Sequence, residues 1–248
     1  MLAVLLAGTA AGAVNAIVGS GTLITFPVLL AVGYPPVLAN VSNTVGLTPG
    51  SISGAIGYRT ELAGQRARLV SLGVASVLGG LTGAVLLLTL PPGAFKAIVP
   101  VLIGISLVLV VLAPRLSRRL AAVPDADAPP ARGGAALHAG VYGAGIYGGY
   151  FGAAQGVLLI GLLGLFLHED LQRINAAKNV LAGLVNGMAA LVFVLVADVA
   201  WAAAGLIAVG SVIGGQLGAS VGRRVPSPAL RALIVLVGVI AIVKILAG

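Results

Sequence analysis

Two polar stripes on otherwise apolar segments carry the residues best suited to bind a ligand. In the second half of the chain, three amides and one lysine lie at positions i, i+3, i+4 and i+11, which places them on one face of a helix. They are Asn175, Lys178, Asn179 and Asn186. The first half has Asn40, Asn43, Thr44 and Ser51 at the same relative positions. Amides, hydroxyls and an ammonium together suit a small anion.

Lys178 gives the clearest reason to expect an anionic ligand. A lysine at the centre of a membrane-spanning helix costs about 2.5 to 3.5 kcal/mol on insertion scales, and no carboxylate lies within the apolar segments to pair with it. Either the ammonium reaches back toward the loop at 168–170, or it binds an anion. The amides also have a purely structural alternative, which is hydrogen bonding between neighbouring helices.

Two long apolar segments are each predicted to contain a break in the helix at a run of small residues. These helix breaks provide a second kind of anion ligand. Segments 2–32 and 135–167 are too long for one straight crossing and too short for two. A helix that restarts after a break exposes backbone N–H groups and its positive dipole end, and both attract anions. The predicted donors around the two breaks are Ser20, Gly21, Thr22, Gln155 and Gly156.

The composition places all of these segments in a membrane. Of the 248 residues, 59% are hydrophobic and only 8% are charged, whereas soluble domains carry about a quarter charged residues. The apolar runs are continuous, while strands of a membrane barrel would alternate apolar and polar residues. Helices are then the only remaining spanning structure. The sequence therefore predicts an all-α polytopic membrane protein.

The chain repeats itself with a shift of 135 residues. The matched pairs include Gly21 and Gly156, Asn40 and Asn175, Gly79 and Gly214, and Gly83 and Gly218. Between the copies, a stretch rich in Pro and Arg at 114–134 has the composition of a linker. The sequence thus predicts two homologous transmembrane repeats, at 1–113 and 135–248.

Each half is predicted to contain a broken, re-entrant helix pair and three spanning helices. The predicted spans are 37–58, 69–90 and 94–113, then 172–196, 200–222 and 228–247. One loop carries Arg59, Arg66 and Arg68, and its counterpart carries only Asp198. The positive-inside rule places these loops on opposite sides and the linker in the cytoplasm. This favours an inverted repeat, a common plan of secondary transporters, over eight spans in parallel repeats.

Small residues at four-residue intervals predict close helix packing. One span carries Gly210, Gly214, Gly218 and Gly222, and the matching span has Ala75, Gly79 and Gly83. Small residues at this spacing let helix backbones approach closely in lipid. We therefore expect Gly214 and Gly218 to lie at a helix-to-helix contact.

Charge and residue types limit the other function classes. The net charge of +8 comes from basic residues in short loops, where they set orientation, so nucleic acid is not an expected partner. The chain has no cysteine and its 2 histidines form no spaced ligand set, so no metal or cofactor is expected. The spans contain no catalytic Ser/His/Asp set and no paired carboxylates, which argues against an enzyme. The expected partners are a small anion and the lipid bilayer; homo-oligomerisation is left open.

Several stretches resemble the TauE/SafE family of sulfite exporters and organosulfur permeases. They are 12–27 (GAVNAIVGSGTLITFP), 35–59, 175–186 (NAAKNVLAGLVN) and 209–223. The resemblance implies a multi-pass carrier of sulfite, sulfonates or similar oxyanions in a bacterial-type plasma (inner) membrane. Family members are often drawn with eight spans, and the second break reads GAAQG instead of the usual glycine-rich turn. The sequence thus predicts an alternating-access oxyanion carrier, with an anion channel or a membrane scaffold as alternatives.

Overall fold

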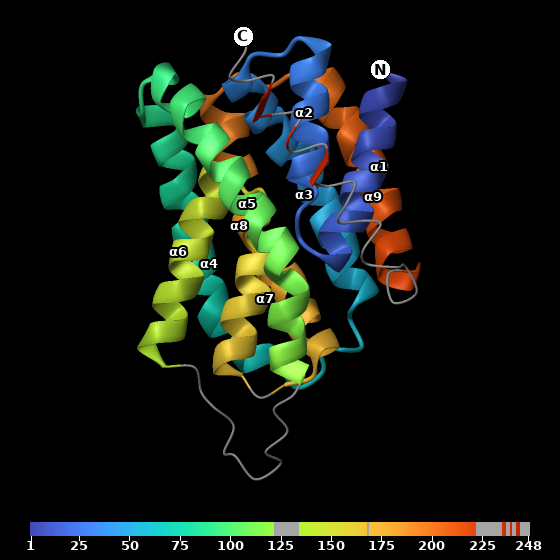
Figure 1. Cartoon of the computed structure of the whole chain (residues 1–248), viewed down its shortest axis with the longest axis vertical. Helices are drawn as coiled ribbons and strands as arrows, with labels where there is room; N and C mark the ends of the chain where they lie inside the picture. Colours follow the sequence, from blue (N-terminus) through green and yellow to red (C-terminus); the bar gives the residue numbers. More distant parts are fainter. Residues whose placement is uncertain (122–133, 168, 222–234, 237–238, 240–241, 244–248) are drawn as a thin grey trace.

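The structure, a computed structural model, describes residues 1–121, 134–167, 169–221, 235–236, 239 and 242–243. This part of the chain is helical and contains no strand (Figure 1). Its helices are α1 (Leu2–Ile17), α2 (Thr22–Val32), α3 (Pro36–Gly57), α4 (Arg66–Thr89), α5 (Pro92–Ala121), α6 (Ala135–Tyr150), α7 (Gln155–Phe166), α8 (Leu171–Val196) and α9 (Trp201–Val221). The all-α prediction is confirmed for these residues.

Most of the predicted spans coincide with long helices. Among the described residues, α4, α5, α8 and α9 are long and apolar enough to cross a membrane. α3 has 22 residues, matches the span predicted at 37–58 and carries one of the polar stripes. The span predicted at 228–247 lies largely outside the described residues. α5 continues to Ala121, so the linker predicted at 114–134 begins within a helix.

Both long segments are divided into two helices that fold back as hairpins. In the first, α2 returns along α1, and Gly21 lies against Ala11. In the second, α7 returns along α6, and a Cβ atom at Gly140 would touch Leu162. In Figure 1 the outer ends of α1 and α2 lie at the top, and those of α6 and α7 lie at the bottom.

Six of the described helices form two groups of three, and each group draws helices from both halves of the sequence. α1 and α3 pack along α9, while α6 and α8 pack along α4. Ile207 and Ser211 of α9 lie against Gly8 and Gly12 of α1, and Ser211 and Ala219 lie against Gly50 and Gly57 of α3, so α1, α3 and α9 run in the same direction. The two groups meet where α3 packs against α8. The predicted halves therefore intertwine through α4 and α9.

Glycines make the closest helix contacts within each group. A Cβ atom at Gly214 would clash with the backbone of Thr9, and one at Gly218 with the backbone of Ala13, both on α1. The equivalent Gly79 lies equally close to the backbone of α6. The predicted packing role of Gly214 and Gly218 is confirmed, because only glycine lets these backbones approach so closely.

Candidate functional site

The two helix breaks meet inside the protein. Gly19, between α1 and α2, has a left-handed φ of 80°, and Gly152, between α6 and α7, has a φ of 78°. Glycine adopts this conformation without steric cost, which explains why the chain turns there. The Gly156 N–H donates a hydrogen bond to the Gly19 carbonyl at 3.1 Å. The beginning of α7 therefore rests directly on the first break.

Three side chains of α8 cap the end of α1. Lys178 Nζ donates to the carbonyls of Asn15 and Ala16, at 2.9 and 3.2 Å. Asn175 and Asn179 donate to the same Ala16 carbonyl, at 3.3 and 3.2 Å. The last carbonyls of a helix lack partners within it and carry partial negative charge, so they suit these donors. Lys178 is completely buried, with an exposed fraction of 0%.

The stripe on α3 makes the corresponding contact with the other hairpin. Asn40 donates to the carbonyl of Tyr150, the last residue of α6, at 2.9 Å. Asn43 donates to the Thr22 hydroxyl at 3.2 Å and accepts from the Thr25 hydroxyl, so it holds the beginning of α2. Each polar stripe therefore fixes the inner end of a helix in the opposite half or at the adjacent break.

The two stripes meet each other across the contact between α3 and α8. Asn186 of α8 and Asn15 of α1 both donate to the Ser51 hydroxyl, at 3.1 and 3.3 Å. The Thr44 hydroxyl instead donates to the Asn40 carbonyl of its own helix at 3.0 Å. The predicted residues thus lie at the two breaks or bond to them, except for Thr44, which bonds within α3, and Asn186, which lies further along α8.

Several buried polar atoms at the breaks lack a hydrogen-bond partner among the described residues. Ser20 Oγ and Gln155 Nε2 occupy equivalent positions at the starts of α2 and α7, and the residues are 0% and 3% exposed. Asn40 Oδ1 and Asn175 Oδ1, on residues 1% and 6% exposed, are also unpaired. Burying such groups unpaired is costly. The breaks therefore offer donors and acceptors that a polar ligand can use.

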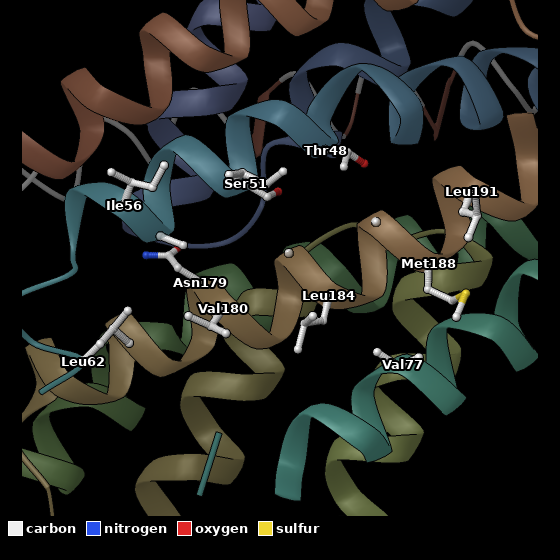
Figure 2. A pocket seen from close by; sticks show the side chains of 14 residues that line it. Thr48, Ser51, Ile56, Leu62, Val77, Asn179, Val180, Leu184, Met188 and Leu191 are labelled. Atoms are coloured by element: carbon white, nitrogen blue, oxygen red, sulfur yellow. The ribbon is translucent and has the colours of Figure 1, made fainter. Parts of the chain in front are cut away.

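A pocket of about 600 Å³ lies between α3, α4 and α8 (Figure 2). Its lining is mostly apolar and includes the polar residues Thr48, Ser51 and Asn179. Ile52 and Leu191 in the lining are 54% and 55% exposed, so the pocket is open at one side. It adjoins the polar stripes through Ser51 and Asn179.

Comparison with known proteins decides the family. The family model described as "Sulfite exporter TauE/SafE" matches residues 4–245. The chain belongs to the TauE/SafE family. It is 27% identical over 242 residues to the "Probable membrane transporter protein YfcA" of Escherichia coli strain K12, covering 95% of this chain and 86% of that protein. A "Probable membrane transporter protein" of Haemophilus influenzae is 24% identical over 235 residues, covering 92% and 88% of the two chains. No solved structure matches.

Membership of the TauE/SafE family identifies the chain as a membrane transporter and confirms the resemblance seen in the sequence. The apolar helices α4, α5, α8 and α9 agree with a membrane-embedded protein. The names of the relatives specify no substrate. The substrate of this TauE/SafE protein must therefore be inferred from its own residues.

The Lys178 side chain does not reach the loop before α8. Contact with that loop was one of the two alternatives that the sequence allows for this lysine. In this TauE/SafE protein that loop forms its own ion pairs, from Glu169 to Arg68 at 3.0 Å and to Arg173 at 2.6 Å. Although burial raises the pKa of the Glu169 carboxyl, the hydrogen bonds and charges of Arg173 and Arg68 outweigh burial and hold that pKa below its usual value. Lys178 Nζ instead bonds to the carbonyls at the end of α1, because its side chain points into the protein.

Sequence reasoning missed two polar residues that hold the breaks of this TauE/SafE protein. Asn15 contributes both a carbonyl to Lys178 and an amide to Ser51. Ser106 of α5 donates to the Ala153 carbonyl in the second break at 2.9 Å. Each is an isolated polar side chain in an apolar segment: Asn15 is the only amide within 2–32, and Ser106 is the only hydroxyl within 97–113. A lone polar side chain in an otherwise apolar segment was the sequence signal that could have indicated these two residues.

Proposed function

We propose that this TauE/SafE protein is a secondary carrier that moves a small oxyanion, such as sulfite or an organosulfonate, across a bacterial-type plasma membrane by alternating access. The observation that carries the proposal is the environment of Lys178. It is a fully buried lysine between two helix breaks, and α1, α3 and α7 around it contain no carboxylate. Buried ionisable residues in membrane proteins commonly mark substrate pathways.

The groups around the breaks suit an oxyanion. Lys178 supplies positive charge, while Ser20 and Gln155 supply unpaired hydroxyl and amide donors at the N-terminal ends of two helices. Helix N-termini favour negative charge through their free N–H groups and dipoles. A sulfite or sulfonate group has three oxygens, each of which accepts hydrogen bonds from donors of these kinds. The family description, which names sulfite, supports the same substrate class.

For alternating access, we propose that the two halves form an inverted repeat. Thr48 and Ser51 contact Asn186, whereas Gly54 lies near Asn179, so α3 and its counterpart α8 run in opposite directions. The hairpins α1–α2 and α6–α7 likewise open toward opposite ends in Figure 1. Inverted repeats around a central site allow one group of helices to rock against the other. The contact between α3 and α8 would be the surface along which they move.

Cysteine labelling tests this topology. The loop that contains Glu61 lies at the bottom of Figure 1, and Asp198 lies in the loop between α8 and α9 at the top. The chain has no native cysteine, so Glu61→Cys and Asp198→Cys each provide a single label site. In intact cells, a membrane-impermeant thiol reagent should modify Asp198→Cys and not Glu61→Cys. Equal labelling of both from outside would contradict the inverted arrangement.

A thermal-shift screen tests the substrate class. Any ligand that binds only the folded state raises the melting temperature, by an amount that grows with its concentration relative to Kd. The detergent-purified protein should melt at a higher temperature with sulfite, sulfate, thiosulfate or methanesulfonate than with chloride at matched ionic strength. A melting temperature that is the same in every salt would argue against an oxyanion site.

Counterflow in proteoliposomes separates a carrier from a channel. Liposomes loaded with a high concentration of the stabilising anion should transiently accumulate the radiolabelled anion from outside, and uptake should saturate. A channel would show neither property, and a scaffold would show no flux. Either result would overturn the carrier mechanism while leaving anion binding to be judged by the thermal shift.

A further inference from the structure

The hydrogen bonds of Lys178 match a neutral amine better than an ammonium group. An ammonium has three N–H donors, and a neutral amine has two. The structure provides two acceptors for Lys178 Nζ, the carbonyls of Asn15 and Ala16. A third donor finds no acceptor among the described residues. The two carbonyls therefore match the two N–H donors of the uncharged side chain.

The surroundings of Lys178 also lack a compensating charge. The neighbouring helices α1, α3 and α7 contain no Asp, Glu, His, Lys or Arg. The C-terminal end of α1 contributes only the partial negative charge of a helix dipole, about half an elementary charge. Burying an ammonium without a full counter-charge is costly. An arriving anion would supply both the missing charge and the third acceptor.

Most of the other titratable groups on the described parts of helices that pack against α8 bond to residues other than Lys178. On α8 itself, Arg173 pairs with Glu169, and Asp170 caps the N-terminus of the helix by accepting from the Gln172 N–H. On α4, α6 and the loop, the partners are Arg68 with Glu169, His138 with Ser71, Tyr142 with Thr82, and Tyr147 with Ser106. Arg66 is exposed in the first turn of α4, and the buried Tyr150 hydroxyl of α6 has no hydrogen-bond partner among the described residues. A phenol is ordinarily uncharged near neutral pH, so Lys178 is the buried group in this region whose charge an arriving anion would change.

We propose that Lys178 takes up one proton from water when the oxyanion binds and releases it when the oxyanion leaves, so that one proton travels with each anion. This inference rests on the oxyanion site proposed above. The proton forms an N–H bond on the amine nitrogen of Lys178, and the resulting third donor points to the anion. With a monovalent anion the loaded site is neutral. Transport is then driven by a pH gradient and is indifferent to membrane potential.

Calorimetry in buffers of different ionisation enthalpy measures the proton directly, because the slope of binding enthalpy against buffer enthalpy counts the protons taken up. Methanesulfonate and sulfate stay ionised between about pH 7 and 9, and sulfite is a third probe after correction for its own protonation. The parent protein should take up close to one proton per anion. Binding with zero slope would overturn the coupling and leave the carrier intact. If none of the three anions binds, the oxyanion site itself is wrong.

Variants assign the proton to Lys178. Lys178→Arg, which keeps its charge at all accessible pH values, should bind the anion with zero slope. Lys178→Met should bind more weakly, also with zero slope. Because histidine ordinarily titrates near neutral pH, the control is His138→Gln combined with His168→Gln, which should keep the parent slope. The assignment would be wrong if Lys178→Arg keeps the parent's slope of binding enthalpy against buffer enthalpy. It would also be wrong if the histidine control loses that slope.

Transport gives a second readout of the same inference. In proteoliposomes, methanesulfonate uptake by the parent should rise with an inward proton gradient and remain unchanged when valinomycin and potassium impose a membrane potential. Lys178→Arg should lose the response to pH. If methanesulfonate uptake by the parent instead changes with the membrane potential and does not change with the pH gradient, the loaded site is not neutral and the inference is wrong.

Discussion

Replacement of Gly214 by leucine is expected to prevent the chain from accumulating as a folded protein. A Cβ atom at this position already clashes with the Thr9 carbonyl of α1, and backbone cannot move aside as a flexible side chain can. Overpacking a tight contact typically costs about 1 to 3 kcal/mol even for small additions, and leucine adds three more carbons. In Gly214→Leu, α1 and α9 must separate along their length. The measurement is the yield of monodisperse protein after extraction in mild detergent.

The same helix offers a matched control for this substitution. Gly205, also on α9, has no atom within 4 Å of an added Cβ. Gly205→Leu should therefore express and melt as the parent does. If Gly214→Leu also behaves as the parent, the contact between α1 and α9 is not as close as the structure shows.

Lys178→Met is expected to weaken oxyanion binding by about ten- to a hundredfold, which corresponds to the roughly 1.5 to 3 kcal/mol of a charge-assisted hydrogen bond. Methionine resembles lysine in length and lacks the amine. The Ala16 carbonyl keeps Asn175 and Asn179 as donors, while the Asn15 carbonyl loses Lys178. The variant should thus remain folded with a reduced melting temperature. Calorimetric titration with the anion that stabilises the parent gives the ratio of the two Kd values.

Arg173→Met is the control for the loss of one positive charge from α8. Arg173, in the first turn of α8, pairs with Glu169 of the preceding loop, and both side chains are partly exposed, so solvent and salt screen the effect of Arg173 on a distant anion. The anion affinity of the Arg173→Met variant should stay within about twofold of that of the parent, since a partly exposed ion pair contributes little. If Lys178→Met binds as tightly as the parent, Lys178 only caps α1, and the anion site would depend on Ser20, Gln155 and the helix ends.

The local features of the site could be predicted from the sequence, because they depend on chain periodicity and on glycine. The 3.6-residue repeat of a helix places Asn175, Lys178 and Asn179 on one face without reference to any neighbour. The long first segments had to break, since their lengths fit neither one crossing nor two. The breaks occur beside Gly19 and Gly152, where glycine permits the left-handed turn.

The partners of those residues could not be predicted in the same way. Lys178 bonds to the carbonyls of Asn15 and Ala16, more than 160 positions away in the chain. Backbone carbonyls occur at every residue and carry no sequence signature, so nothing in the residue types indicates which helix end a lysine will cap. The loop at Glu169 was an equally reasonable destination until the structure showed its pairs with Arg68 and Arg173.

By itself, the sequence determined that this protein is helical, embedded in a membrane and a member of the TauE/SafE family, because composition, periodicity and motifs are properties of the chain alone. Only the tertiary structure decided that α4 and α9 each pack with the opposite half, and that Gly19 and Gly156 join the two breaks. The physical reason is that in lipid close packing between helices, rather than hydrophobicity, selects the partners. Packing depends on the shapes of two surfaces brought together, and those surfaces come from distant parts of the sequence.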